Sequence, residues 1–413
     1  MTPQQWNLSS FGDYIESCRN GFGRRPQGTE EGPIVLRLAD VSTGKIDLSK
    51  PRRVSMTHEE LNGYKLQQGD LIFVRVNGSR DYVGQCILVE QSYDDVVFND
   101  HLMRVKLKPG LHSGFAHVLF SLPQIRLSML SHIPPSAGGQ LTINQQSLSS
   151  IEIPVPPLPE QRQIAAILGK WDEAIRLTAD LIAAKQQRKK GLMQRLLSGE
   201  VRFRKMDGTD FPDWQETKLS NLLYEHKERN RNLRFGKPDV LSVSGDAGIV
   251  NQIEHLGRSY AGESVANYHV VHHTDIVYTK SPLKANPYGI IKCNRGEAGI
   301  VSTLYAVYTC TDLAEGRYLE HYFSLDDNVN RYLRPLVRKG AKNDMKINNQ
   351  HVLSGAFTCP TREEQQKIAD FLDTCDDEIG LLEQKLAALQ QQKKGLMQQL
   401  LTGRVRVKTT DDG

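Results

Sequence analysis

The sequence has no closely spaced pair of cysteines. Its six cysteines are scattered along the chain, at Cys18, Cys86, Cys293, Cys310, Cys359 and Cys375. Without a CxxC spacing, neither a zinc ribbon nor a thioredoxin-like redox motif is indicated. We expect the thiols to be reduced and mostly buried.

Long hydrophobic runs are also missing. No segment approaches the roughly 18 consecutive apolar residues that a membrane span requires. The first residues, MTPQQWNLSSFGDYIESC, have neither the basic nor the apolar part of a secretion signal. These two absences predict a cytoplasmic protein without a membrane segment.

Charge of one sign is not in large excess. The 52 Lys and Arg residues nearly balance the 48 Asp and Glu residues, which leaves a net charge of +4. This excess is too small to indicate nucleic-acid binding, so any such role depends on local clusters of basic residues. The hydrophobic content of 39% in 413 residues is sufficient for cores in about two to four domains.

Motifs of catalysis and metal binding are incomplete. The segment ADVSTGKI (39–46) lacks the first glycine and the final hydroxyl of a phosphate loop, and NPYG (286–289) lacks one proline of the adenine methyltransferase signature. The histidines of HVVHH (269–273) have no cysteine or carboxylate nearby at a useful spacing. We therefore expect turns in the first two segments, and no catalytic residue, bound metal or cofactor in this chain.

What the sequence does contain is an internal duplication. Shifted by 204 residues, segment 160–203 matches segment 364–407 at 23 of 44 positions without a gap, and both copies include KKGLMQ. The sequence before each copy has diverged much further. A period of about 200 residues is too long for a solenoid, so each copy is a domain followed by a helix.

Each duplicated segment has the spacing of a long helix with one apolar seam. We expect the two helices to pack on each other as an antiparallel coiled coil, with two separate dimerisation helices as the alternative. Prolines precede both segments, and Gly199 and Gly403 occupy the positions of terminating glycines. The predicted seam residues are Ile164, Leu168, Trp171, Ile175, Ile182, Leu192, Leu196, Ile368, Leu372, Ile379, Leu382, Leu386, Leu389, Leu396 and Leu400.

The diverged parts alternate short β-branched runs with Gly, Asn and Asp turns, which predicts mixed α/β domains. The fold class is therefore α+β, with two homologous domains, two long helices and a pseudo-twofold internal duplication. The expected boundaries are a first domain at 1–158, a first helix at 159–199, a second domain at 200–362, a second helix at 363–403 and a tail at 404–413.

Short basic segments in both diverged domains are the best candidates for nucleic-acid contacts. Lys and Arg supply affinity for phosphates, and Arg and Asn can make bidentate contacts with base edges. Solvated surface is the usual role of any one such residue. The candidate DNA-binding residues are Arg75, Asn77, Arg80, Lys280, Lys284, Asn286, Arg338, Lys339 and Lys342.

With these features together, the chain resembles the specificity subunits of type I restriction–modification systems. The resemblance is carried by IPVPPLPEQRQIAAIL (153–168), by KKGLMQRLLSGEVRF (189–203) and by their second copies. The second helix start, CPTREEQQKI, keeps Glu364, Gln365 and Ile368 but only one proline.

The resemblance implies a subunit without catalytic activity that reads a bipartite double-stranded DNA target with two recognition domains. It implies that the paired helices fix the spacer between the half-sites and dock two methyltransferase subunits, which carry S-adenosylmethionine, and that restriction subunits join this complex. On the outward face of the helices, we expect docking near Gln161, Lys190, Gln365 and Lys394. The alternatives are a stand-alone DNA methyltransferase or nuclease on a duplicated scaffold, and a coiled-coil scaffold without a DNA role.

Overall fold

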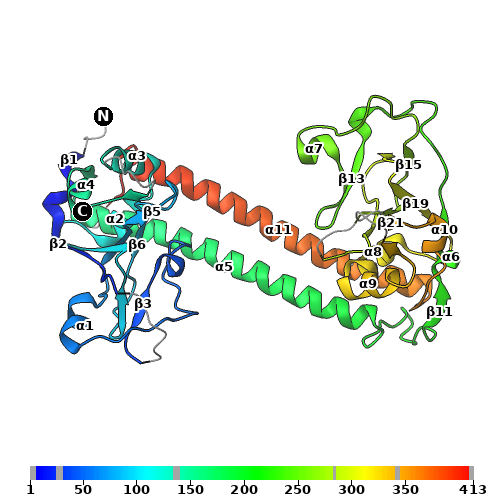
Figure 1. The fold of residues 1–413 in the computed structure, drawn as a ribbon, viewed down its shortest axis with the longest axis horizontal. Coiled ribbons are helices and arrows are strands. Elements are labelled where there is room, and N and C mark those ends of the chain that lie inside the picture. Colours follow the sequence, from blue (N-terminus) through cyan, green and yellow to red (C-terminus); the bar gives the residue numbers. More distant parts are fainter. Residues whose placement is uncertain (1–5, 25–30, 134–139, 282–284, 340–344, 409–413) are drawn as a thin grey trace. The chain divides into compact units, whose positions relative to one another are not determined.

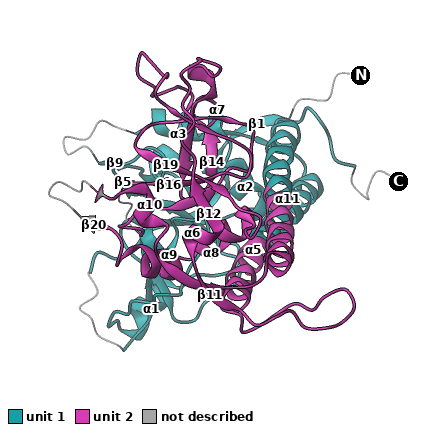
Figure 2. Cartoon of the chain, turned by 90° about the vertical axis from the view of Figure 1, so that its right-hand side faces the viewer, with its two compact units in different colours: residues 1–179, 384–413 teal, residues 180–383 magenta. Residues whose placement is uncertain are grey.

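The computed structural model describes residues 6–24, 31–133, 140–281, 285–339 and 345–408 (Figure 1). The chain forms two compact units (Figure 2). Unit 1 consists of residues 1–179 and 384–413, and unit 2 consists of residues 180–383. In the part of the chain that the structure describes, no helix is long and apolar enough to cross a bilayer.

Each unit is built around a four-stranded antiparallel sheet, and the strand order is equivalent in the two units. In unit 1 the order is β2 (Ile15–Asn20), β8 (Leu102–Leu107), β4 (Leu71–Val74) and β6 (Cys86–Leu88). In unit 2 it is β12 (Leu223–Glu225), β19 (Tyr305–Cys310), β16 (Ile276–Thr279) and β17 (Ile291–Cys293). The duplication therefore includes the domains as well as the helices.

Other elements are repeated around these sheets. A two-stranded antiparallel pair comes just before each long helix, formed by β1 (Asn7–Ser10) with β10 (Glu152–Val155) and by β11 (Gln215–Lys218) with β22 (Ala356–Cys359). Three short helices correspond in order: α2 (Ser113–Leu119) to α8 (Gly316–Ser324), α3 (Pro123–Ser131) to α9 (Asp326–Leu333), and α4 (Gln145–Ser149) to α10 (Asn349–Val352).

The units differ in the strands outside this common frame. Unit 1 pairs β3 (Ile34–Leu36) with β7 (Val96–Phe98) in parallel, and adds helix α1 (His58–Tyr64). Unit 2 instead has two antiparallel pairs and helix α7 (Gln252–Leu256), while its helix α6 (Leu219–Leu222) takes the place of the 3-10 helix Phe11–Tyr14 of unit 1. The pairs are β13 (Leu241–Ser244) with β14 (Gly248–Asn251), and β15 (His269–Val271) with β18 (Gly299–Val301).

The two long helices are α5 (Leu158–Leu197) and α11 (Arg362–Leu400). Pro159 lies in the first turn of α5, where its missing N–H costs no helical hydrogen bond. Gly199 and Gly403 follow the helix ends with φ of 75° and 70°, a conformation that favours glycine. All the predicted seam residues are buried or half-buried, whereas Leu381, next to the seam, is 66% exposed.

Within each unit, a part of α5 lies against a part of α11, and the two helices run antiparallel. In unit 2, Lys185 binds Glu378 at 2.5 Å and the later Lys189 binds the earlier Asp376. In unit 1, Lys393 binds Asp172 at 2.5 Å. The pairs Lys189–Asp376 and Lys393–Asp172 are related by the 204-residue repeat, so the same ion pair joins the two helices in each unit.

Each compact unit includes a part of both long helices. A part of the segment after the second helix is bound within unit 1. The Arg406 guanidinium binds the buried Glu160 carboxylate with two distances of 2.7 Å. The repeat-related Arg202 binds the buried Glu364 in unit 2. The segment after each helix is thus attached to the start of the other helix.

Candidate nucleic-acid interface

In both units the predicted DNA-contacting loops begin beyond the same end of the central sheet. The segment with Arg75 follows Val74, which pairs with Leu102 at the start of β8. The segment with Lys280 follows Thr279, which pairs with Tyr305 at the start of β19. Each long helix is attached to residues that follow the opposite end of β8 or β19. Equivalent edges of the two domains therefore carry the candidate loops.

Arg75 is a support for this edge in unit 1. Its Nη1 donates to the Asp100 carbonyl at 3.0 Å, and its Nε is buried without a hydrogen-bond partner among the described residues. The side chain is half-buried. This placement favours a role in holding the loop over a direct contact with DNA.

Arg80 is the exposed member of the unit 1 candidates. The loop that carries it begins with β5 (Val76–Asn77), and the Asn77 Oδ1 accepts from the Ser79 N–H at 2.9 Å. The Arg126 Nη2 donates to the carbonyls of Arg80 and Asp81, at 3.0 Å each. The loop backbone is therefore fixed while the Arg80 side chain extends into solvent.

Lys280 of unit 2 is held by a polar chain. Its Nζ donates to the Asn349 Oδ1 at 2.9 Å, and the Asn349 Nδ2 donates to the Glu225 Oε1 at 2.7 Å. Burial lowers the pKa of Lys280 from its ordinary value, against the opposing effect of Glu225. Like Arg75, Lys280 is better placed to support the edge than to reach a ligand.

Asn286 belongs to a tight turn, as the sequence predicts. The Gly289 N–H donates to the Asn286 carbonyl at 3.1 Å, and the Asn286 Nδ2 donates to Asp326 at 3.0 Å. Gly289 has φ of 93°, and a Cβ there would lie 2.0 Å from the Thr279 carbonyl oxygen. The NPYG segment is thus a turn that requires glycine. The ADVSTGKI segment is also a turn, with Gly44 at φ of 80°.

Two of the four remaining candidates lie in a short strand of unit 2. Arg338 and Lys339 form β20, which pairs with β21 (Met345–Lys346). In unit 1, strand β9 (Leu141–Thr142) corresponds to β21 by the 204-residue repeat, but it pairs with β5. Lys284 and Lys342 lie outside the described residues.

The expectation that Gln161 and Gln365 lie on the outward face of the helices is wrong. Their exposed fractions are 0% and 1%. The Gln161 amide accepts from the His112 N–H and donates to the carbonyls of Gly110 and Pro156. Gln365 makes the same three kinds of bond, with the Glu315 N–H and the carbonyls of Leu313 and Pro360. Each glutamine joins a helix start to its own domain.

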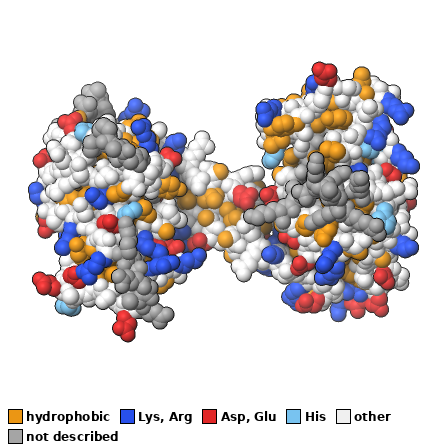
Figure 3. Space-filling model, in the orientation of Figure 1, with side chains coloured by type: hydrophobic (Ala, Val, Ile, Leu, Met, Phe, Trp, Pro, Cys, Tyr) orange, Lys and Arg blue, Asp and Glu red, His pale blue; other side chains and the backbone are white. Residues whose placement is uncertain are grey.

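Lys190 and Lys394, by contrast, are exposed on α5 and α11. They remain candidates for a partner contact. Figure 3 shows Lys and Arg side chains spread over the visible face of each unit, with acidic side chains among them.

The family model for the type I restriction modification DNA specificity domain matches residues 49–185. Over most of the chain, the protein is similar to a putative type I restriction enzyme MjaX specificity subunit from Methanocaldococcus jannaschii, at 25% identity over 98% of this chain and 95% of that protein. The EcoKI specificity subunit of Escherichia coli is 31% identical over 38% of this chain and 33% of its own length.

A type I restriction–modification S subunit structure from M. genitalium has the same fold, with a TM-score of 0.56. It is 13% identical and is matched over 97% of this chain and 99% of that one. The two equivalent sheets and the paired helices show a duplicated fold, and residues 49–185 match a DNA specificity domain. Over nearly its full length, the chain is similar to specificity subunits of type I restriction–modification systems.

Proposed function

We propose that the chain directs a methyltransferase and restriction complex to a bipartite DNA sequence, with one half-site read by each unit. The observation that carries this proposal is the placement of different loops at the same edge of two equivalent sheets. Because the two sheets are equivalent, both units can bind DNA in the same orientation. Because their loops differ, the two units can contact different bases.

The helices would set the spacer between the half-sites. With 40 and 39 residues, each is roughly 60 Å long, and one turn of DNA is about 34–36 Å. Two recognition units about one turn apart are therefore within reach of such a pair. The exposed face near Lys190 and Lys394 would dock the two methyltransferase subunits, and restriction subunits would complete the assembly.

The chain itself would perform no chemistry in this proposal. The phosphate-loop-like and methyltransferase-like segments are turns, which supports a recognition role. S-adenosylmethionine would be bound by the methyltransferase subunits, which would also extract the target adenine from the helix.

Sequencing of methylated DNA tests the proposal directly. A host without other DNA methylation would express this chain with its methyltransferase partner, and a matched host would express the partner alone. We expect a bipartite methylated-adenine motif only where the chain is present. If the methylation pattern is the same in both hosts, the chain does not supply specificity, and a scaffold role without DNA reading is favoured.

Replacement of Arg80 by alanine tests the edge assigned to DNA. In the assembled complex, we expect affinity for the target to fall by about 1–2 kcal/mol, or roughly tenfold, because an exposed guanidinium beside the duplex is lost. Lys108→Ala is the matched control, since this exposed lysine follows the other end of β8. Equal affinities of the two variants, measured at one salt concentration, would remove Arg80 from the interface.

A further inference from the structure

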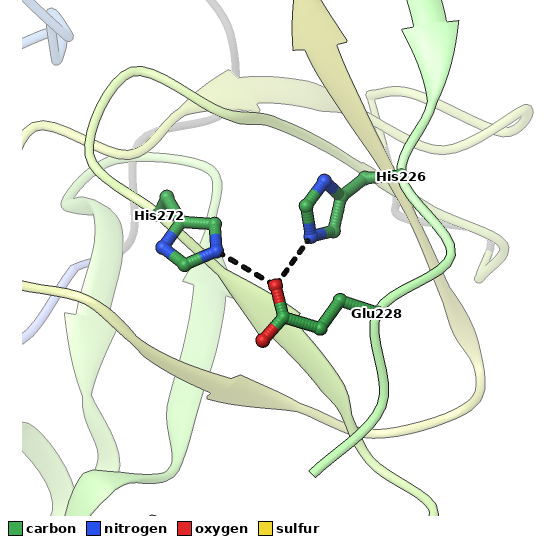
Figure 4. Close-up of side chains that lie close together, drawn as sticks. All are labelled: His226, Glu228 and His272. Carbon is green, nitrogen blue, oxygen red and sulfur yellow. Dashed lines mark hydrogen bonds and ion pairs between the residues drawn. The ribbon is translucent and has the colours of Figure 1, made fainter.

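Two histidines and a glutamate of unit 2 converge on one point (Figure 4). The Glu228 Oε2 lies 3.0 Å from the His272 Nε2 and 3.4 Å from the His226 Nε2. All three ligand atoms lie within 4.8 Å of one another. Four-coordinate zinc with bonds of about 2.0–2.1 Å separates its ligand atoms by roughly 3.3 Å. The two carboxylate–imidazole distances are close to that separation.

The hydrogen bonds around His226 determine which ring nitrogen carries its proton. The Thr309 hydroxyl donates its hydrogen to the Asp275 Oδ1 at 2.7 Å. The same hydroxyl therefore accepts from the His226 Nδ1–H, at 3.1 Å. In the neutral imidazole, the lone pair is then on Nε2, which is buried and has no hydrogen-bond partner among the described residues.

A lone pair that faces a carboxylate oxygen is unfavourable unless a cation lies between them. The Glu228 Oε2 faces both Nε2 atoms, and the hydrogen bond from His272 holds the pKa of Glu228 below its ordinary value. The cation can be a proton on the imidazole or a metal ion that both nitrogens and the carboxylate share. Imidazole and carboxylate together suit zinc and related divalent ions.

One buried carboxylate supports both histidines. Asp275 is only 2% exposed. Its Oδ2 accepts a hydrogen bond from the His272 backbone N–H at 2.8 Å, and its Oδ1 accepts one from the Thr309 hydroxyl. Through Thr309, Asp275 fixes the orientation of the His226 imidazole, as outer partners of metal-binding imidazoles do, and at His272 it holds the backbone. The backbone is fixed as well, since Arg229 and His269 form an antiparallel bridge between the two segments.

A second cluster of His321, Asp373 and Asp376 lacks these properties. Asp373 already binds Arg295 at 2.5 Å and Arg317 at 3.0 Å, and Asp376 binds Lys189. Although burial acts in the opposite direction, the hydrogen bonds from His321 and Arg295 hold the pKa of Asp373 well below its usual range. Three cationic side chains would compete with an added metal ion there.

We propose that His226, Glu228 and His272 form a Zn²⁺-binding site of the second recognition unit, with the fourth position open to water. The side chains of Glu228 and His272 are 50% and 42% exposed, so solvent reaches the ion. The metal would join the segment after β12 to the segment after β15. It would thereby stabilise the region of the antiparallel β15–β18 pair, whereas unit 1 has the parallel β3–β7 pair. The sequence did not indicate this site, because His226 and Glu228 lie in the segment after β12, far from His272 in sequence.

The test is a titration of the metal-free full-length chain with Zn²⁺ at pH 7.5, followed by metal analysis after dialysis. We expect the unmodified chain to keep one more equivalent of Zn²⁺ than His272→Ala, and Glu228→Gln to bind that equivalent at least tenfold more weakly. His273→Ala is the matched control. The His273 imidazole is adjacent to His272 in sequence, but it is exposed and forms a hydrogen bond with the Gly296 carbonyl instead of facing the proposed site. This control should keep the equivalent.

Two further measurements distinguish this site from cysteine binding and from misfolding. Co²⁺ should give the visible absorption of a four-coordinate ion without a thiolate charge-transfer band, and His272→Ala should lose that absorption. Without metal, His272→Ala should unfold at the same temperature as the unmodified chain, and added Zn²⁺ should raise that temperature only in the unmodified chain and in His273→Ala. Equal Zn²⁺ stoichiometry in the unmodified chain and in a folded His272→Ala would overturn the proposal and leave a protonated His–Glu cluster.

Discussion

Arg202→Ala should lower the free energy of unfolding of unit 2 by about 3 kcal/mol, because it leaves a buried carboxylate without its cation. The Glu364 side chain is fully buried, and Arg202 donates to it from Nε at 3.1 Å and from Nη2 at 2.9 Å. For a unit of this size, the loss corresponds to a fall of roughly 6–12 °C in the unfolding temperature. Calorimetry or circular dichroism would measure it.

The control for this prediction is Arg204→Ala. Arg204 forms an ion pair with Asp210 at 3.2 Å, but both side chains are more than 70% exposed, so its loss should change stability by under about 0.5 kcal/mol. Removing the buried charge as well should restore stability, so Arg202→Ala with Glu364→Gln should be more stable than Arg202→Ala alone. If the double variant is the less stable one, the cost comes from lost packing and not from the unpaired charge.

The equivalent ion pair of unit 1 joins Arg406 to Glu160, which lie in different copies of the repeat. Glu160 lies in the first turn of α5, while Arg406 follows the end of α11. The Arg406 guanidinium also lies over the Trp6 ring, 5.7 Å from its centroid. In unit 2, the Trp214 Nε1 instead donates to Glu364 at 3.1 Å. Both units thus complete their structure with the segment after a helix that starts in the other unit.

The sequence was sufficient to predict the long helices because their residues have changed little between the copies. It also indicated strands in both domains, but not the order of those strands. The central strand β8 was not recognised, because Arg104 and Lys106 interrupt its apolar residues. Arg104 is nevertheless only 8% exposed, since its guanidinium donates to the Lys65 carbonyl at 2.5 Å. Only the fold shows that this charge has an internal partner.

The candidate site shows the same limit. Gln161 and Gln365 are polar residues in both copies, and this pattern alone suits a partner contact as well as an internal one. Their partners, such as the carbonyls of Gly110 and Leu313, lie about 50 residues earlier in sequence. Hydrogen bonds of that range depend on how the domain folds around the helix start. The choice between an interface and a structural bond therefore could not be made from the sequence.

Substitutions at the two ends of α11 should destabilise different units. Leu372 is 0% exposed in the core of unit 2, and Leu400 is 3% exposed in the core of unit 1. Replacing either buried leucine by alanine leaves a cavity and should cost about 3 kcal/mol. Leu381→Ala is the control on the same helix, and because this side chain is 66% exposed it should cost under about 0.5 kcal/mol.

Hydrogen exchange followed by mass spectrometry would locate each loss. Leu372→Ala should accelerate exchange in the β12–β19–β16–β17 sheet, and Leu400→Ala should accelerate it in the β2–β8–β4–β6 sheet, because each leucine packs in the core of that unit alone. Faster exchange in both sheets from either substitution would mean that the chain unfolds as one cooperative body. The two units would then share their stability through the helices, and a substitution that weakens one unit would also weaken the other.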